Sequence, residues 1–193
     1  MKLDSEIESA VKRGDTGFLE KYLNSENVNE VNEQAQNPLM IATYQNDYSL
    51  AALLVKRGAD PNQQDELLNS PFLYAGASGY LDLVKLYLAY GARFDVYNRY
   101  HGTALIPAAE KGHVEVVRLL AHTKNFPINH VNKLGWTAMM EAVVLGDGSK
   151  DYVEIVNILL KAGADKNIPD KDGIYAIEHA KQKGFNDIVE LLH

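Results

Sequence analysis

The stretch Thr103–Leu120, TALIPAAEKGHVEVVRLL, decides the fold, because variants of it recur along the chain. Each variant opens with a short apolar segment that closes on an alanine. These alanines stand at positions 42, 75, 108, 142 and 180, so the steps between them are 33, 33, 34 and 38 residues. A weaker first copy places Ala10 32 residues before Ala42. A period near 33 residues over most of a chain indicates a repeat architecture.

Each copy predicts two helices and a loop. The run Val114–Leu120 has apolar residues three and four positions apart, which is typical of a helix with one buried face. Glycines at 58, 91 and 163 stand where three such helices should end in a left-handed residue. The copy is therefore a short inner helix, a tight turn, a longer outer helix and an extended loop. The tight turns should contain the residues four positions after each alanine: Asn46, Gly79, Gly112, Gly146 and Gly184.

Several residues should begin or interrupt these helices. Pro107 lies about four residues into its inner helix, where it lacks an amide donor and clashes with an earlier carbonyl, so we expect an irregular first turn. About five extra residues within 146–151 should lengthen the turn between the two helices of the fifth repeat. Four inner helices should begin at a capping side chain, namely Asn37, Ser70, Thr103 and Thr137.

The recurring motifs resemble the ankyrin-repeat family. The matching segments include Ala108–His113 with the helix after it, Gly58–Asn62 and Asp170–Gly173. The resemblance extends from about residue 3 to residue 193. The chain departs from the family's Pro-Leu-His motif, which reads Pro38-Leu39-Met40 in the second repeat. Apolar packing should therefore replace the hydrogen bonds that the family's histidine makes.

The resemblance implies an all-α repeat solenoid of about six stacked ankyrin repeats. Each repeat should be a helix-turn-helix with a hairpin loop, and the outer two repeats should act as caps. Stacked repeats bury one continuous core, so we expect residues 1–193 to form a single domain. The repeats should span about 3–30, 31–62, 63–95, 96–129, 130–167 and 168–193.

Composition excludes several classes of protein. The 193 residues carry a net charge of −7, with 46% hydrophobic and 23% charged residues, as folded proteins do. The acidic balance disfavours nucleic acid as a partner. No apolar run approaches the roughly 18 residues that span a bilayer, and the first residues lack a signal-peptide pattern. We therefore expect a cytoplasmic protein without a membrane partner.

The sequence contains no catalytic or metal-binding motif, so we expect neither enzymatic activity nor a cofactor. Cysteine is absent, which removes disulfides, thiolate metal sites and a cysteine nucleophile. His101 and His130 lie in adjacent loops where they could approach each other, but two histidines alone make an incomplete metal site.

In the ankyrin family, loop tips and inner helices line a concave surface that binds other proteins, and the resemblance implies the same here. Tyrosine and tryptophan are frequent binding anchors, and four of them fall on this surface as a possible aromatic track. The loop tips are acidic early in the chain and basic later, which would orient a partner of opposite pattern. The expected protein-binding residues are the aromatic Tyr44, Tyr74, Tyr100 and Trp136, the acidic Glu66, the apolar Leu67, and the basic Arg99 and Lys133.

Each of these features also has a structural explanation. Trp136 could cover the base of its loop, and Tyr44 and Tyr74 could fill the space left by the missing histidines. The charge gradient could be ordinary solvated surface. The leading hypothesis is a noncatalytic, monomeric module that binds a protein or peptide. The alternatives are a self-associating structural scaffold and a targeting domain of a larger effector or enzyme.

Overall fold

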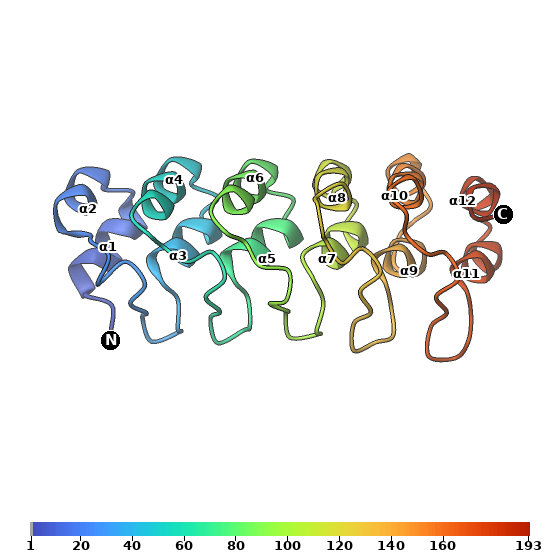
Figure 1. The fold of residues 1–193 in the computed structure, drawn as a ribbon, viewed down its shortest axis with the longest axis horizontal. Helices are drawn as coiled ribbons and strands as arrows, with labels where there is room; N and C mark the ends of the chain where they lie inside the picture. Colours follow the sequence, from blue (N-terminus) through green and yellow to red (C-terminus); the bar gives the residue numbers. More distant parts are fainter. Residues whose placement is uncertain (1) are drawn as a thin grey trace. The chain divides into compact units, whose positions relative to one another are not determined.

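The computed structural model describes residues 2–193 and divides them into two compact units. Unit 1 contains the chain up to Ala75 together with Tyr80–Arg99, and unit 2 contains Gly76–Gly79 and Tyr100–His193. Within the described residues, all twelve regular elements are helices (Figure 1). None of these helices is long and apolar enough to cross a bilayer.

Unit 1 is built from helix pairs in which the odd-numbered helix is the inner one. In Figure 1 its inner and outer helices form two separate layers. The last two residues of α5 belong to unit 2. The helices are α1 (Ser5–Arg13), α2 (Thr16–Tyr22), α3 (Pro38–Tyr44), α4 (Tyr48–Lys56), α5 (Pro71–Ala77) and α6 (Leu81–Ala89).

Unit 2 repeats the same arrangement with three further pairs. Its outer helix α10 is longer than the others, with 12 residues against eight in α8. The helices are α7 (Leu105–Glu110), α8 (Val114–Ala121), α9 (Ala138–Val144), α10 (Lys150–Lys161), α11 (Ala176–Lys183) and α12 (Asn186–Leu192).

The recurrent alanine of each inner helix is completely buried. Its exposure is 0% at Ala10, Ala42 and Ala75, and again at Ala108, Ala142 and Ala180. A methyl group is small enough for neighbouring helices to approach closely at this point. Larger apolar side chains, such as Leu39, Leu54 and Tyr87 in unit 1, fill the space around it and are also buried.

Asparagine side chains join consecutive repeats in the loops that follow the outer helices. Asn29 donates to the Gly58 carbonyl at 2.9 Å and accepts the Asp60 amide at 2.8 Å. Asn62 repeats both bonds one repeat later, with the Gly91 carbonyl and the Arg93 amide. In unit 2, Asn129 accepts the Asp165 amide at 2.8 Å. These bonds satisfy backbone groups in the loops that follow the outer helices.

The insertion in the fifth repeat lengthens a helix as well as a turn. The turn runs from 145 to 149, and α10 begins at Lys150 with an extra N-terminal turn. That extra turn places Tyr152, whose hydroxyl donates to the Glu110 carbonyl at 2.7 Å. Gly146 lies in this turn, as expected, and the left-handed residue of the turn is Gly148, with a φ of 74°.

Pro107 disturbs the start of its inner helix, as predicted. In the neighbouring repeat, Glu141 donates its amide to the Thr137 carbonyl at 3.0 Å. Pro107 occupies the position of Glu141 but has no amide to give to the Thr103 carbonyl. Helix α7 consequently begins one residue late, at Leu105, and has no side-chain cap.

The predicted cap at Thr103 was therefore wrong. Asn37, Ser70 and Thr137 each accept the amide three residues further along, as expected. The Thr103 hydroxyl is instead buried without a hydrogen-bond partner. A buried hydroxyl without a partner costs folding free energy, whereas a capping hydroxyl stabilises its helix.

Replacing these two threonines by valine should have different effects. Thr137→Val should lower the free energy of unfolding by about 1 kcal/mol, because it removes a helix cap. Thr103→Val should change stability by less than about 0.5 kcal/mol, or raise it, because no hydrogen bond is lost. Urea unfolding followed by circular dichroism measures both. Equal losses at the two positions would contradict the assignment.

Candidate interaction surface

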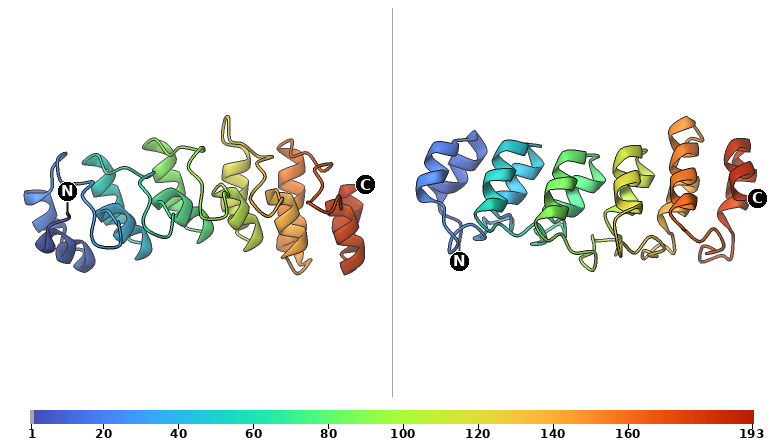
Figure 2. Two further views of the ribbon diagram at one scale, coloured as in Figure 1. Left: turned by 90° about the horizontal axis from the view of Figure 1, so that it is seen from below. Right: turned by 45° about the horizontal axis from the view of Figure 1, so that its top comes forward.

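The loops that precede the inner helices are the candidate binding elements, and we call them fingers. Figure 2 shows the fingers extending beyond the helices within each unit. Finger 2 (30–37) and finger 3 (63–70) belong to unit 1, and finger 5 (130–137) and finger 6 (168–175) belong to unit 2. Finger 4 (96–103) runs from unit 1 into unit 2.

A side-chain carbonyl or carboxylate oxygen holds the base of fingers 2, 3, 5 and 6. In finger 3, Asp65 Oδ1 accepts the amides of Leu67 at 2.9 Å and Asn69 at 3.0 Å. The residues at the same position of fingers 2, 5 and 6 accept the amides two and four residues further along; they are Asn32, Asn132 and Asp170. The fingers are therefore ordered turns that hold their tip residues in fixed positions.

Neighbouring fingers are also linked through their backbones. In unit 1, the Glu66 amide donates to the Gln34 carbonyl at 3.1 Å. In unit 2, the Lys133 amide donates to the Tyr100 carbonyl at 2.9 Å. Successive tips consequently lie side by side within each unit, so their side chains form a surface that one partner segment could contact.

Two of the predicted aromatic anchors meet in unit 1. The rings of Tyr44 and Tyr74 pack edge to face with their centroids 4.5 Å apart, and both side chains are half-buried. The Tyr44 hydroxyl donates to Asp65 Oδ2 at 2.5 Å and accepts from the Asn69 amide group at 3.1 Å. Burial, followed by the bond to Asp65, raises the pKa of Tyr44 well above its ordinary value. Tyr44 therefore supports finger 3 and also presents part of its ring to solvent.

The predicted residues of unit 2 lie at the ends of fingers 4 and 5. Tyr100 is 49% exposed, Lys133 is exposed and Trp136 is half-buried. The Trp136 amide is one of the two held by Asn132, at 3.1 Å. The ammonium group of Lys171, in finger 6, donates to the Lys133 carbonyl. These side chains are accessible on ordered loops, as a binding surface requires.

The remaining predicted residues are exposed in unit 1. Glu66 and Leu67 stand at the tip of finger 3, and Arg99 is the last residue of the unit. The change of charge sign along the tips is therefore present at the surface. Whether any of these residues binds a partner stays a prediction.

A buried carboxyl group lies beneath finger 5 and was not anticipated. Glu141 on α9 is only 5% exposed, and its Oε1 accepts from the Asn132 amide group at 2.7 Å. Burial, and secondarily the negative charge of Glu110, raises the pKa of Glu141 to about 7 from its ordinary 4.5. In finger 6, His179 and Asp170 make the corresponding contact at 2.7 Å. Side chains of the inner helices thus support the bases of fingers 5 and 6.

Elsewhere in the described chain, the candidate metal-binding residues do not form a ligand site. Residues 2–193 contain no group of three side chains suited to holding a metal ion. The predicted approach of His101 and His130 is confirmed, with ring centroids 5.3 Å apart. The His130 ring nitrogen lies 2.7 Å from the His101 carbonyl, so this contact joins two loops.

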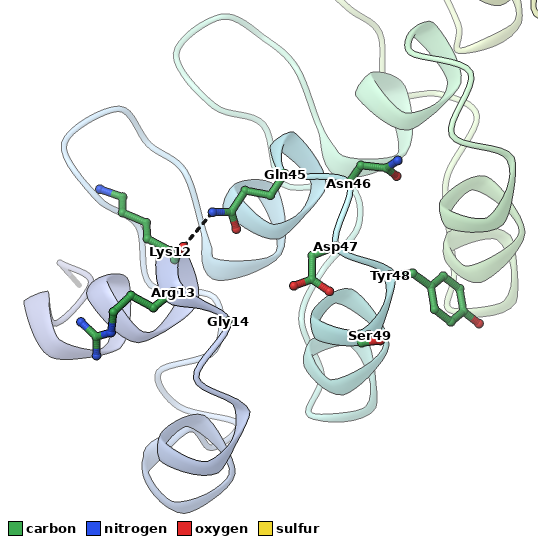
Figure 3. A pocket seen from close by; sticks show the side chains of 8 residues that line it. All are labelled: Lys12, Arg13, Gly14, Gln45, Asn46, Asp47, Tyr48 and Ser49. Carbon is green, nitrogen blue, oxygen red and sulfur yellow. Dashed lines mark hydrogen bonds between the residues drawn. The ribbon is translucent and has the colours of Figure 1, made fainter.

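An open hollow of about 480 Å³ lies at the turn end of the helices in unit 1 (Figure 3). Its polar groups serve the helix ends around it. The Gln45 amide group donates to the Lys12 carbonyl at 2.9 Å, and Asp47 caps α4 through the Leu50 amide. Figure 3 shows the Lys12 and Arg13 side chains directed away from Asp47. We therefore interpret the hollow as a seam between two repeats.

Comparison with known protein families settles the type of repeat. The family model described as three copies of the ankyrin repeat matches residues 72–170, and the single-repeat model matches residues 36–66. The chain belongs to the ankyrin-repeat family. It is 36% identical over 166 residues to the ankyrin repeat protein YahD of Escherichia coli strain K12, a match that covers 86% of this chain and 82% of YahD.

Solved ankyrin structures share the fold over nearly the whole chain. An ankyrin repeat domain from Acinetobacter baumannii AYE has a TM-score of 0.93 and 44% identity, covering 97% of this chain and 95% of that domain. The ankyrin repeat protein EF0377 has a TM-score of 0.92 and 39% identity, covering 96% and 95% respectively. The predicted family and fold class are confirmed. Ankyrin repeats are generally noncatalytic protein-interaction modules, which fits the predicted class of function.

Removing the buried charge of Glu141 should stabilise the ankyrin domain at alkaline pH. The pKa of Glu141 is raised in the folded state. Between about pH 4.5 and pH 7, Glu141 is therefore protonated in the folded protein and ionised in the unfolded chain. Its contribution to stability is therefore greatest at low pH and decreases as the pH rises. Glu141→Gln should raise the free energy of unfolding at pH 8 by about 1–3 kcal/mol and have little effect at pH 4.

Urea unfolding at several pH values measures this difference against Glu26→Gln, an exposed control position. The control should leave stability nearly unchanged at each pH. A stability difference between wild type and Glu141→Gln that does not vary with pH would show that folding does not shift the pKa of Glu141.

Proposed function

We propose that this chain is a noncatalytic interaction module that binds a protein or peptide partner on its fingers and the adjacent inner helices. The single observation that carries this proposal is the Tyr44–Tyr74 pair beside finger 3, where two aromatic rings 4.5 Å apart remain partly exposed. Aromatic side chains contribute large contact areas at a small entropy cost, and they dominate the affinity of many interfaces.

Order in the fingers supports the same proposal. The hydrogen bonds that Asp65 and Asn132 accept from backbone amides fix fingers 3 and 5 before any partner binds. Binding to a fixed surface loses less conformational entropy than binding to a mobile loop. The exposed charges of Glu66, Arg99 and Lys133 would then orient the approaching partner and speed its encounter.

We further propose that the partner is a protein and that the chain acts in the cytoplasm as a monomer. The net charge of −7 disfavours the phosphate backbone of nucleic acids. The polar surface of the last helix α12, which includes Asn186, Asp187 and Glu190, disfavours end-to-end stacking of copies.

Substitution of the aromatic residues tests the binding surface. A variant with Tyr74, Tyr100 and Trp136 replaced by alanine keeps Tyr44, because the Tyr44 hydroxyl satisfies Asp65. Each replaced side chain should cost about 1–2 kcal/mol of binding, so the affinity should fall by at least about 100-fold. The measurement is capture of partners from a lysate of the source cells, followed by titration calorimetry with the captured protein.

A matched control uses tyrosines in, or directly after, the outer helices. Tyr22, Tyr48 and Tyr90 are exposed, at 48%, 50% and 40%. Their triple alanine variant should capture the partner like the wild type, and circular dichroism should show that both variants are folded. Loss of capture in the control, with full capture by the finger variant, would place binding on the outer helices instead.

A further inference from the structure

The tip of finger 3 exposes two adjacent leucines. Leu67 is 57% exposed and Leu68 is 45% exposed. A single exposed leucine is common on protein surfaces, but a pair at the end of an ordered loop forms a small apolar projection. Neither side chain contributes to the buried core of unit 1, so the stability of the fold does not explain their presence.

Leu68 also holds an unfavourable backbone conformation. Its φ is 57°, in the left-handed region that side chains with a Cβ atom rarely adopt. The same position is glycine in fingers 5 and 6, at Gly135 and Gly173, alanine in finger 2, at Ala35 with a φ of 58°, and histidine in finger 4, at His101 with a φ of 58°. A bulky leucine therefore stands where the turn itself favours glycine.

Surrounding contacts impose this conformation. The Leu68 amide donates to the Asp65 carbonyl at 3.0 Å, and the Leu68 carbonyl accepts from the Gln64 side chain at 2.8 Å. The next residue, Asn69, is bonded to the Tyr44 hydroxyl. Strained residues persist where neighbouring bonds determine their geometry, and such residues concentrate at binding sites. The structure thus fixes the backbone that carries the two leucines before a partner binds.

Charge near the leucines limits the chemistry of the partner. Glu66 precedes them, is exposed, and forms no ion pair within residues 2–193. Among the residues that the structure describes, Glu33 in finger 2 pairs only with Lys2, and both side chains are about three-quarters exposed, so this contact is weak. Acidic groups beside an apolar projection favour a partner that offers apolar contacts next to basic groups.

We propose that Glu66, Leu67 and Leu68 form an anchoring subsite for a peptide segment that combines apolar side chains with lysine or arginine. This inference rests on the proposed function and adds to it the class of partner and the residue Leu68. The leucine at position 68 exchanges stability for binding, because glycine would suit the turn better but would offer no contact. Replacing Leu68 by glycine should therefore weaken binding and raise stability together, which a purely structural role of Leu68 would not produce.

The test selects binders from a displayed library of random short peptides, using the full chain as bait. The selected peptides should be enriched in lysine or arginine next to leucine, isoleucine, valine or aromatic residues. Leu68→Gly should weaken their binding by at least about tenfold, and should raise the melting temperature by about 1–3 °C through relief of the left-handed strain. Leu67→Ser should weaken binding without that rise.

Ala35→Gly is the matched control, because Ala35 has the same left-handed conformation in the neighbouring finger. It should raise the melting temperature in the same direction and leave peptide affinity unchanged. Glu66→Lys should reverse the preference for basic peptides. These effects separate a contact made by the Leu68 side chain from a general effect of the turn.

Several results would overturn the inference. They are a selection that yields no binder, a selection of acidic peptides, and unchanged affinity in Leu68→Gly. If Tyr74→Ala abolishes binding while Leu68→Gly does not, the inference fails and the proposed function stands. If neither variant, nor Trp136→Ala, affects the selected peptides, both fail.

Discussion

At six equivalent positions, from Ala10 to Ala180, an alanine methyl group is completely buried inside a helix pair and its neighbours. A pair of short helices cannot bury its apolar face alone, and the inner helices here have only six to nine residues. Each repeat therefore depends on the next one for its core. A larger side chain at the alanine position would push the neighbouring helix away, so this one small residue sets the spacing of the repeats within each unit.

Stacking also determines which residues are available for function. Helix faces and the asparagine bonds at Asn29 and Asn62 are used to join repeats. The finger tips are held from below by their own base residues, so their exposed side chains can vary without loss of the core. Tyr44 has both a supporting and an exposed part, because its hydroxyl supports Asp65 while its ring faces Tyr74 and solvent. A function placed on the fingers is thus compatible with the stability of the stack.

Periodicity allowed the sequence to predict the helix pairs, three of the four inner-helix caps and the family. It could not predict how one substitution alters a local turn. The orphaned hydroxyl of Thr103 and the late start of α7 follow from Pro107, whose effect depends on its position relative to one carbonyl group. Burial of Glu141 and the left-handed backbone of Leu68 depend on packing and turn geometry, which residue type does not reveal. The candidate surface was therefore only partly predictable: Tyr44 and Tyr74 meet as an aromatic pair, whereas Leu68 was missed.

Hydrogen exchange of the full chain, with and without its captured partner, tests most directly whether the fingers are the binding surface. The account predicts slower exchange at the amides of the finger tips, around residues 33–36, 66–69 and 133–136, while the outer helices α4 and α10 stay unchanged. Protection confined to the outer helices, with unchanged exchange at every finger tip, would contradict it.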